Sequence, residues 1–278
     1  MDKLFRSLPP FKGKQRLARV LLRNAIKNRR NLEITGKYGC GYIIPNVMES
    51  VGFEIFINGA YEPEIQELII KLLPLNGCFF DLGANIGSIV VPVAKRRPDV
   101  KAIAVEAAPW VFAYLEKNIL INELKNVQLV NNALFDEDDK ELDFFSPEGD
   151  FAKGSLSPVF TKEGVKVKSK KVDTIAKDLK IEKIDLIKID VEGFEYFVFK
   201  GGENLLKSDE APILVFEFVD WGEKQARGLE PGSAQRLLLE MGYTLYEIRD
   251  NKLLKRDTIF TSGYYNMVAS KKEIPYSF

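Results

Sequence analysis

The stretch Phe79-Phe80-Asp81-Leu82-Gly83-Ala84-Asn85-Ile86-Gly87-Ser88 decides the fold of this chain. It predicts a short buried strand, a glycine-rich turn and the start of a helix. Gly83 and Gly87 allow a positive φ, and Asn85 is the residue type after glycine best suited to a left-handed conformation. Ligands of open α/β sheets lie beyond the carboxyl ends of the strands. We therefore expect a ligand-binding site at this turn.

Apolar runs of strand type alternate with helical patterns around this stretch. Helices are expected near 86–97, 109–122 and 194–207. This alternation predicts βαβ units and hence an α/β fold with a mostly parallel sheet. The expected strands are 78–82, 102–105, 127–131, 184–189 and 213–218.

Further strands are predicted outside these units. Segments 142–145 and 165–172 indicate an inserted hairpin, and the alternating lysines within 166–170 are typical of an exposed edge strand. Two last strands, near 244–248 and 264–269, are expected to close the sheet.

We predict that residues 1–60 form a small helix and β extension and that residues 61–278 form the main domain. The extension contains a basic amphipathic helix over 14–30 and short strands at 32–34 and 42–44. A helix over 64–73 opens the main domain. The apolar side of the basic helix is expected to comprise Leu17, Val20, Leu21, Leu22, Ala25 and Ile26.

Composition excludes several classes of protein. The 278 residues include no histidine, which removes Ser-His-Asp hydrolases, Cys-His proteases and histidine-based zinc peptidases. Cys40 and Cys78 are too few for a disulfide framework or a zinc knuckle. No apolar run is long enough to span a bilayer, and arginines interrupt any secretory signal. We therefore expect a cytoplasmic protein.

Charge is unevenly distributed along the chain. Residues 1–30 contain ten basic side chains and one acidic side chain, Asp2, although the net charge of the whole chain is +0. This basic arm either contacts an anionic membrane surface or a lipid-linked glycan, or is a solvated helix face that packs on the domain. Aromatic residues do not alternate with the basic ones, so no nucleic acid is expected.

The turn at 83–87 distinguishes two kinds of nucleotide cofactor. A dinucleotide-binding turn has the pattern G-x-G-x-x-G, whereas Asn85 replaces the middle glycine here and Gly87 comes one residue early. Asp81 would repel a pyrophosphate and attract a ligand that carries an ammonium and a sulfonium. Glu106 ends the next strand, where nucleoside-binding folds place a ribose-binding acid. This acid fits either cofactor, and the turn favours the cationic one.

The motifs together resemble those of the FkbM-type methyltransferases, a branch of the Rossmann-like class I methyltransferases. The similarity runs from about Tyr61 to the end of the chain, and its most specific part is the stretch 187–195 with Gly201 and Gly202. The other matching stretches are 80–87, 105–109 and 132–134.

The resemblance implies a seven-stranded sheet with a C-terminal antiparallel hairpin and S-adenosylmethionine as the cofactor. It also implies that the ribose lies on Glu106 and the adenine near Asn132 and Ala133, with Tyr61 and Glu62 as a flanking pair. The methionine part would lie on the turn and the strand end before it, formed by Asp81, Gly83, Ala84, Asn85 and Gly87, with Asp190 nearby.

An acidic group follows the fourth predicted strand. Because side chains alternate along a strand, Lys188, Asp190 and Glu192 are expected on one face, with Glu217 next to them at the end of the fifth strand. Three interpretations stay open. In the first, Asp190 or Glu192 acts as the base toward the acceptor. In the second, Asp190, Glu192 and Glu217 bind Mg²⁺. In the third, Glu192 and Glu195 only cap the helix start and pair with Lys188.

We predict an S-adenosylmethionine-dependent O-methyltransferase whose acceptor is a hydroxyl of a sugar, glycan or similar metabolite. The acceptor pocket is expected from 146–164 and 219–233, with Trp221 as a platform for a sugar. The alternatives are an NAD(P)-dependent oxidoreductase and a cofactor-binding scaffold without turnover.

Overall fold

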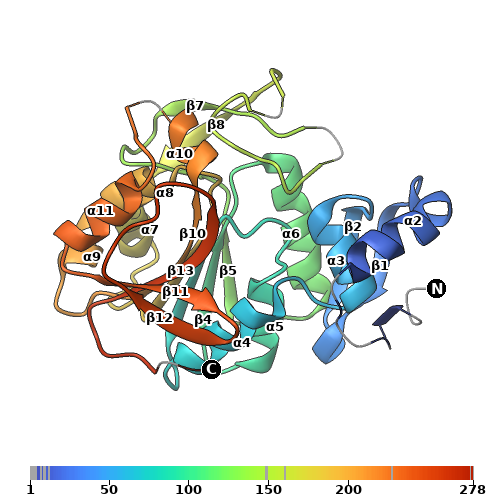
Figure 1. Ribbon diagram of the computed structural model, residues 1–278, viewed down its shortest axis with the longest axis horizontal. Coiled ribbons are helices and arrows are strands. Elements are labelled where there is room, and N and C mark those ends of the chain that lie inside the picture. Colours follow the sequence, from blue (N-terminus) through green and yellow to red (C-terminus); the bar gives the residue numbers. More distant parts are fainter. Residues whose placement is uncertain are drawn as a thin grey trace.

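The computed structural model describes residues 5, 6, 8, 11, 13–147, 150–159, 161–226, 228–275 and 277. An eight-stranded sheet runs through their centre (Figure 1). Its strands, in spatial order, are β12 (Lys252–Arg256), β11 (Thr244–Arg249), β13 (Tyr264–Ser270), β10 (Ile213–Val219), β9 (Leu186–Ile189), β3 (Cys78–Leu82), β4 (Lys101–Val105) and β5 (Val127–Val130). From β10 to β5 the neighbours are parallel, and β13, β11 and β12 pair antiparallel. The predicted α/β fold and its C-terminal hairpin are confirmed.

The sheet has one more strand than we predicted. β12 follows β11 through a tight turn at Asp250 and Asn251, whose φ angles are 50° and 57°. Asp and Asn are the residues after glycine that adopt this conformation most readily, and such a turn suits a two-residue hairpin. β12 was missed because the strand is short and rich in lysine and arginine, which suits an edge strand.

Helices cover both faces of the sheet (Figure 1). Alternation along β3 sends Phe79 into one buried cluster and Phe80 into the other. The first face is covered by α4 (Pro63–Leu72), α5 (Val90–Arg96) and α6 (Pro109–Ile121), and the second by α7 (Val172–Asp178), α8 (Glu195–Gly201), α9 (Glu203–Lys207) and α11 (Ser233–Glu240). β3 lies between both layers, and its five residues are buried.

The predicted inserted hairpin is present. β7 (Glu141–Phe144) pairs antiparallel with β8 (Val165–Lys170), and β6 (Ala133–Leu134) completes a three-stranded sheet. β8 ends before the predicted boundary because Val172 already begins α7. Lys166 forms an ion pair with Asp143 at 2.9 Å. The prediction of an edge strand is wrong, because β8 is the middle strand and pairs with both β6 and β7. Its lysines alternate because one face of this small sheet is exposed.

The N-terminal segment packs against α6. It contains α2 (Lys14–Ile26), β1 (Arg30–Thr35), η1 (Lys37–Gly39), β2 (Gly41–Asn46) and α3 (Ser50–Asn58). Asn118 of α6 and Asn122, at the end of that helix, accept hydrogen bonds from the backbone N–H groups of Ile43 and Gly41, at 2.7 and 2.8 Å. The apolar side chains of this segment belong to the same buried cluster as those of α4, α5 and α6.

The apolar side predicted for the basic helix is only partly correct. α2 ends at Ile26 and buries Ala18, Leu22 and Ile26, which are four residues apart. Leu17, Val20 and Leu21 are exposed. Lys3 and Lys12 of the predicted basic arm, with its single acid Asp2, lie outside the described residues.

Among the helices that the structure describes, none combines the length and the apolar character that a bilayer crossing requires.

Candidate active site

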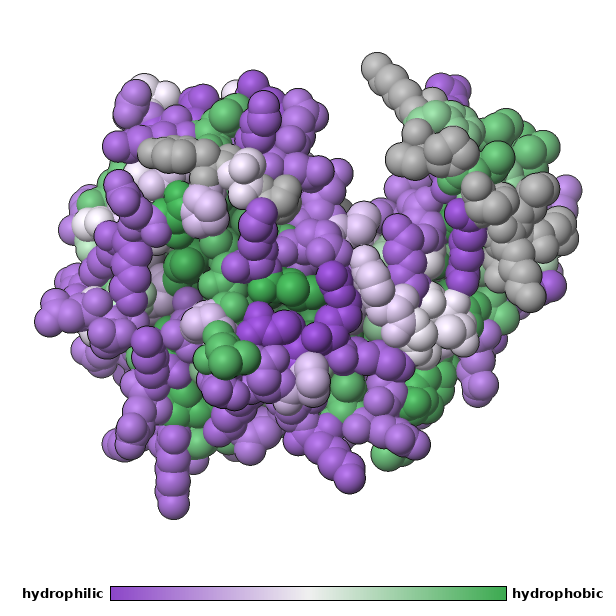
Figure 2. Space-filling view, turned by 90° about the horizontal axis from the view of Figure 1, so that it is seen from below, coloured by the Kyte–Doolittle hydropathy of each residue, from purple (hydrophilic) through white to green (hydrophobic). Residues whose placement is uncertain are grey.

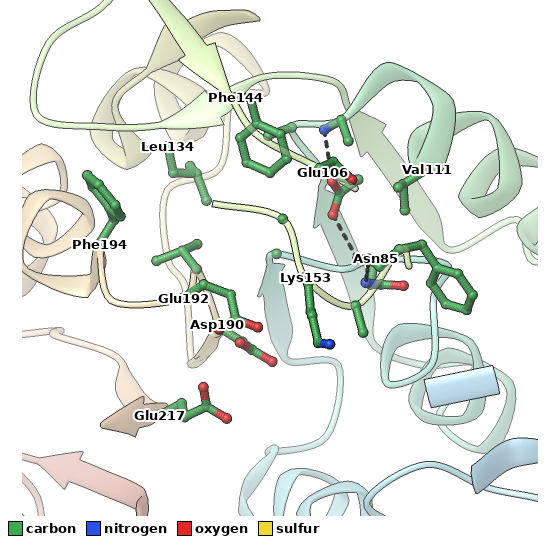
Figure 3. Close-up of a pocket in the computed structure, with 18 of the residues that line it drawn as sticks. Asn85, Glu106, Val111, Leu134, Phe144, Lys153, Asp190, Glu192, Phe194 and Glu217 are labelled. Carbon is green, nitrogen blue, oxygen red and sulfur yellow. Dashed lines mark hydrogen bonds between the residues drawn. The ribbon is translucent and has the colours of Figure 1, made fainter. Parts of the chain in front are cut away.

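A cavity of about 340 Å³ opens where β3, β4, β9 and β10 end (Figure 3). This is the range in which proteins bind small molecules and cofactors. Its wall includes many residues that the sequence singled out, and Asp190, Glu192 and Glu217 lie across it from Asn85 and Glu106. The singled-out residues on the wall are Tyr61, Gly83, Asn85, Glu106, Asn132, Ala133, Lys188, Asp190, Glu192, Glu217 and Trp221.

The turn after β3 adopts the predicted left-handed conformation. The φ angles of Gly83, Asn85 and Gly87 are 80°, 53° and 88°. A Cβ on Gly83 would lie 1.9 Å from the carbonyl oxygen of Asp190, so glycine is required because two strand ends meet there. The backbone N–H of Ala84 donates to the carbonyl of Val105 at the end of β4, and that of Gly87 donates to the carbonyl of Ala84. Neither residue lines the cavity. Their contribution is the shape of the turn.

A buried lysine stands between two aspartates behind the turn. Asp81 and Lys188 are paired in register between β3 and β9, and the Nζ of Lys188 lies 3.8 Å from Asp81 and 3.1 Å from Asp190. Burial raises the pKa of Asp81 to about 6, although Lys188 opposes this shift. Burial acts to lower the pKa of Lys188, but Asp190 and Asp81 hold it above its ordinary value.

Burial disfavours the charged form of Asp81. It is fully buried, and neither carboxylate oxygen has a hydrogen-bond partner among the described residues. Such a group is costly unless a ligand or a counter-charge compensates it. It does not line the cavity itself and lies directly behind the turn.

Glu106 forms the opposite wall. Its carboxylate accepts hydrogen bonds from the backbone N–H groups of Asn85 at 3.0 Å and Ala108 at 2.9 Å (Figure 3). Burial raises its pKa to about 7 in spite of these bonds. Each carboxylate oxygen keeps a lone pair for a further donor. Asn132 and Ala133 continue this wall, and the side-chain amide of Asn132 donates to the carbonyl of Lys168.

Asn85 has a second function that the sequence did not indicate. Its side-chain amide donates to the carbonyl oxygen of Phe151 at 2.7 Å, which fastens the inserted loop to the turn. Ser50 and Val51 of α3 also line the cavity. The inserted loop and the N-terminal segment therefore both complete the wall around the turn.

The acidic group converges, but not for the predicted reason. β9 ends at Ile189, so Asp190 and Glu192 lie in the following turn and strand alternation does not align them. Glu192 has a φ of 52°, a conformation that is uncommon for a non-glycine residue and that concentrates at functional sites. Burial, reinforced by the charge of Asp190, raises the pKa of Glu192 to about 8 and that of Glu217 well above its ordinary value.

Glu195 has a structural role. Its carboxylate accepts hydrogen bonds from the backbone N–H groups of Val191 at 3.1 Å and Gly193 at 3.4 Å. It does not line the cavity. These donors belong to the turn before α8, and the helix start has no side-chain cap, so Glu195 fixes the turn and does not cap the helix. Glu192 faces the cavity.

Two glycines bring Trp221 to the cavity. A Cβ on Gly193 would lie 2.2 Å from the carbonyl carbon of Gly222, so the two backbones touch. This contact places α10 (Asp220–Gln225) beside the acidic group. Trp221 is 36% exposed and lines the wall, with Phe151, Lys153 and Leu156 of the inserted loop.

Tyr61 and Glu62 precede α4. Tyr61 lines the cavity, whereas Glu62 lies behind the wall, has a φ of 41° and forms a hydrogen bond with Asn266. Burial raises the pKa of Glu62 to about 7, and Asp190 adds to the shift. Glu62 therefore extends the acidic group behind the cavity.

Sequence reasoning missed Tyr264. This residue of β13 lines the cavity and forms a hydrogen bond with Glu217. Burial raises its pKa, and the charge of Glu217 adds to the shift. The register that pairs β13 with β10 brings it there, and no local pattern encodes that register.

Among the described residues, no group of three or more acidic or cysteine side chains is arranged to hold a metal ion.

The sheet order, the glycine turn after β3 and the acid after β4 define a Rossmann-like class I methyltransferase domain. The chain belongs to the family described as the methyltransferase FkbM domain, which matches residues 81–245. The predicted family is thereby confirmed. The NAD(P)-dependent oxidoreductase is disfavoured accordingly.

Individual relatives are distant. Methyltransferase sdnD of Sordaria araneosa is 28% identical in an alignment 178 residues long, which covers 53% of this chain and 66% of that protein, just under two thirds of its length. Among solved structures, the precorrin-6y C5,15-methyltransferase of Geobacter metallireducens GS-15 is 16% identical, with a TM-score of 0.43 over 75% of this chain and 87% of the other. TYW2 of M. jannaschii, solved in complex with AdoMet, is 17% identical, with a TM-score of 0.42 over 87% and 85% of the two chains.

Proposed function

We propose that this protein transfers the methyl group of S-adenosylmethionine to a hydroxyl of a sugar, glycan or similar metabolite. The observation that carries the proposal is the group formed by Asp190, Glu192 and Glu217 at one end of the cavity. A hydroxyl must lose its proton when it is methylated, and carboxylates with raised pKa values are suited to accept that proton.

The residues on the opposite side fit the cofactor. The buried carboxylate of Asp81, without a hydrogen-bond partner among the described residues, supplies negative charge behind the turn for a ligand with an ammonium and a sulfonium. Glu106 offers lone pairs to two ribose hydroxyls, and Asn132 and Ala133 border the space for the adenine. When bound, S-adenosylmethionine supplies an electrophilic methyl group on a positively charged sulfur.

The protein positions the acceptor and accepts its proton. Glu217 and Glu192 are both on the cavity wall and each has a raised pKa. Tyr264 lies beside Glu217 on the cavity wall, and its hydroxyl donates to that carboxylate. Alignment of the hydroxyl with the methyl group contributes up to roughly 7–11 kcal/mol in well-oriented reactions. Orientation by this group therefore adds to its action as a base.

The acceptor side also suits a carbohydrate. The partly exposed indole of Trp221 offers an apolar face next to the carboxylates, the combination that holds a sugar ring by its C–H face and its hydroxyls. The inserted loop contributes Lys153 and the apolar Leu156 to the same region. This wall supports a polyhydroxylated acceptor.

The test is turnover with matched acceptors. The full-length protein is incubated with S-adenosylmethionine and with sugars, their amino analogues and planar phenols, and adenosylhomocysteine release is followed with mass spectrometry of the product. We expect O-methylated sugar. Methylation on nitrogen or carbon alone would refute the hydroxyl acceptor, and cofactor binding without adenosylhomocysteine release from any donor would favour a scaffold.

A further inference from the structure

The basic N-terminal helix α2 exposes an apolar stripe. Val20 is 72% exposed, Leu21 63% and Leu17 45%. Positions three and four residues apart lie on one face of a helix, so these side chains form a continuous stripe. Single exposed apolar residues are ordinary, whereas a contiguous group indicates a contact surface.

The opposite side of α2 is fixed to the protein. Ala18, Leu22 and Ile26 are buried in the main core. The guanidinium of Arg19 donates to the carbonyl of Met48 at 2.7 Å and lies 4.3 Å from the centre of the Phe53 ring. The helix is therefore held in one orientation, and the apolar stripe faces away from the domain.

Basic side chains flank the apolar stripe. Arg16, Arg23 and Lys27 are exposed and spaced by seven and four residues, which places them along one edge of the stripe. Arg29 and Arg30 follow directly, and residues 13–32 contain no acidic side chain. In Figure 2 hydrophobic side chains reach the surface of the lobe on the right, which is the N-terminal part of the molecule in Figure 1.

We propose that α2 binds the surface of an anionic lipid bilayer, with Leu17, Val20 and Leu21 inserted among the acyl chains and Arg16, Arg23 and Lys27 at the headgroups. Helices that lie in a membrane interface combine these two features, an apolar face and a basic flank. A partner that offers only negative charge would leave the apolar stripe in water, and a purely apolar partner would bury the basic flank. An anionic bilayer takes up the apolar stripe among its acyl chains and the basic flank at its headgroups.

The charge contribution has a definite size. Each basic residue near an anionic membrane strengthens binding about fivefold at physiological salt. Reversal of two such residues should therefore weaken binding at least about 25-fold. The surface is independent of the proposed methyl transfer, because α2 contributes no residue to the cavity wall.

The test is sedimentation of the full-length protein with phosphatidylcholine vesicles that contain or lack phosphatidylserine. We expect binding only to the anionic vesicles and a decrease at high salt. The double variant Val20→Glu, Leu21→Glu should bind at least about tenfold more weakly. The variant Arg23→Glu, Lys27→Glu should bind these vesicles at least about 25-fold more weakly.

Matched controls come from exposed apolar residues elsewhere. Leu75 and Leu120 are 80% and 75% exposed, so Leu75→Glu with Leu120→Glu adds the same charge outside α2 and should leave vesicle binding unchanged. Equal binding to neutral and anionic vesicles, or full binding by the Val20, Leu21 variant, would overturn the proposal. So would binding to heparin or RNA in place of vesicles, or a dimer in light scattering that the Val20, Leu21 variant abolishes.

Discussion

The burial of Glu106 has two consequences, a pH-dependent stability of the fold and a pH-dependent affinity for the cofactor. Substitution of Glu106 by glutamine tests both. Burial raises the pKa of Glu106 from an ordinary 4.5 to about 7, so the folded state binds this proton more tightly than the unfolded chain. Stability from this group is fully present below pH 4.5 and is lost as the pH rises through 7. Integrated from pH 5 to pH 8, the loss is about 2.5 kcal/mol.

The Glu106→Gln variant cannot ionise at this position and should not show this loss. Unfolding is followed by heat and by urea at pH 5 and pH 8 for both proteins. For a chain of this size 1 kcal/mol changes Tm by about 2–4 °C, so the wild type should lose roughly 5–10 °C more than the variant. The variant itself is less stable at pH 5, because an amide cannot accept from both Asn85 and Ala108.

The same variant tests the ribose contact. Ribose hydroxyls donate to the ionised carboxylate, so the cofactor should bind the wild type more tightly as the pH rises through 7, with release of a proton. Calorimetry should show an affinity for S-adenosylmethionine about 10–100-fold lower in Glu106→Gln. Glu141→Gln, on exposed β7, is the control and should follow the wild type. Parallel pH profiles of wild type and Glu106→Gln, with equal affinities, would show the reasoning to be wrong.

Three further outcomes are expected. Glu217→Gln should lower kcat about 10²–10⁴-fold while cofactor affinity is kept, and unchanged turnover would remove Glu217 from the chemistry. In urea unfolding, Gly193→Ala should lower stability about 1–3 kcal/mol more than Gly228→Ala. Both glycines have a positive φ, but a Cβ at 193 would collide with Gly222, whereas a Cβ at 228 would meet no described heavy atom within 4 Å. A chelator should leave turnover unchanged, and loss that Mg²⁺ restores would establish a metal.

The central part of the fold was predictable from sequence because it is buried on both faces. β3 and β4 are almost continuous apolar runs, and such runs between helical patterns leave few alternatives to a parallel sheet. β12 has a short, charged sequence without strand alternation, and only its pairing with β11 makes it a strand. The exposed half of α2 was misassigned because composition does not reveal which side of a helix the domain covers.

A site residue was predictable from sequence wherever the strand that it follows also brings it to the cavity. Glu106 and Asp190 directly follow strands whose carboxyl ends share an edge of the sheet, so their convergence follows from the parallel order. Tyr264 reaches the cavity through an antiparallel register, and Ser50 through the packing of the N-terminal segment. Those placements depend on tertiary contacts that no short motif contains.

The two most specific motifs of the sequence are halves of one structural unit. Gly83 is required at its position by the carbonyl of Asp190, and Asp81 is in register with Lys188. Each half therefore constrains the other before any ligand binds. A larger residue at 83 would push the β9 end away from β3 and separate Lys188 from Asp81, which would leave a buried charge without its partner. The glycine turn consequently holds the acidic group in place as well as shaping the cofactor side of the cavity.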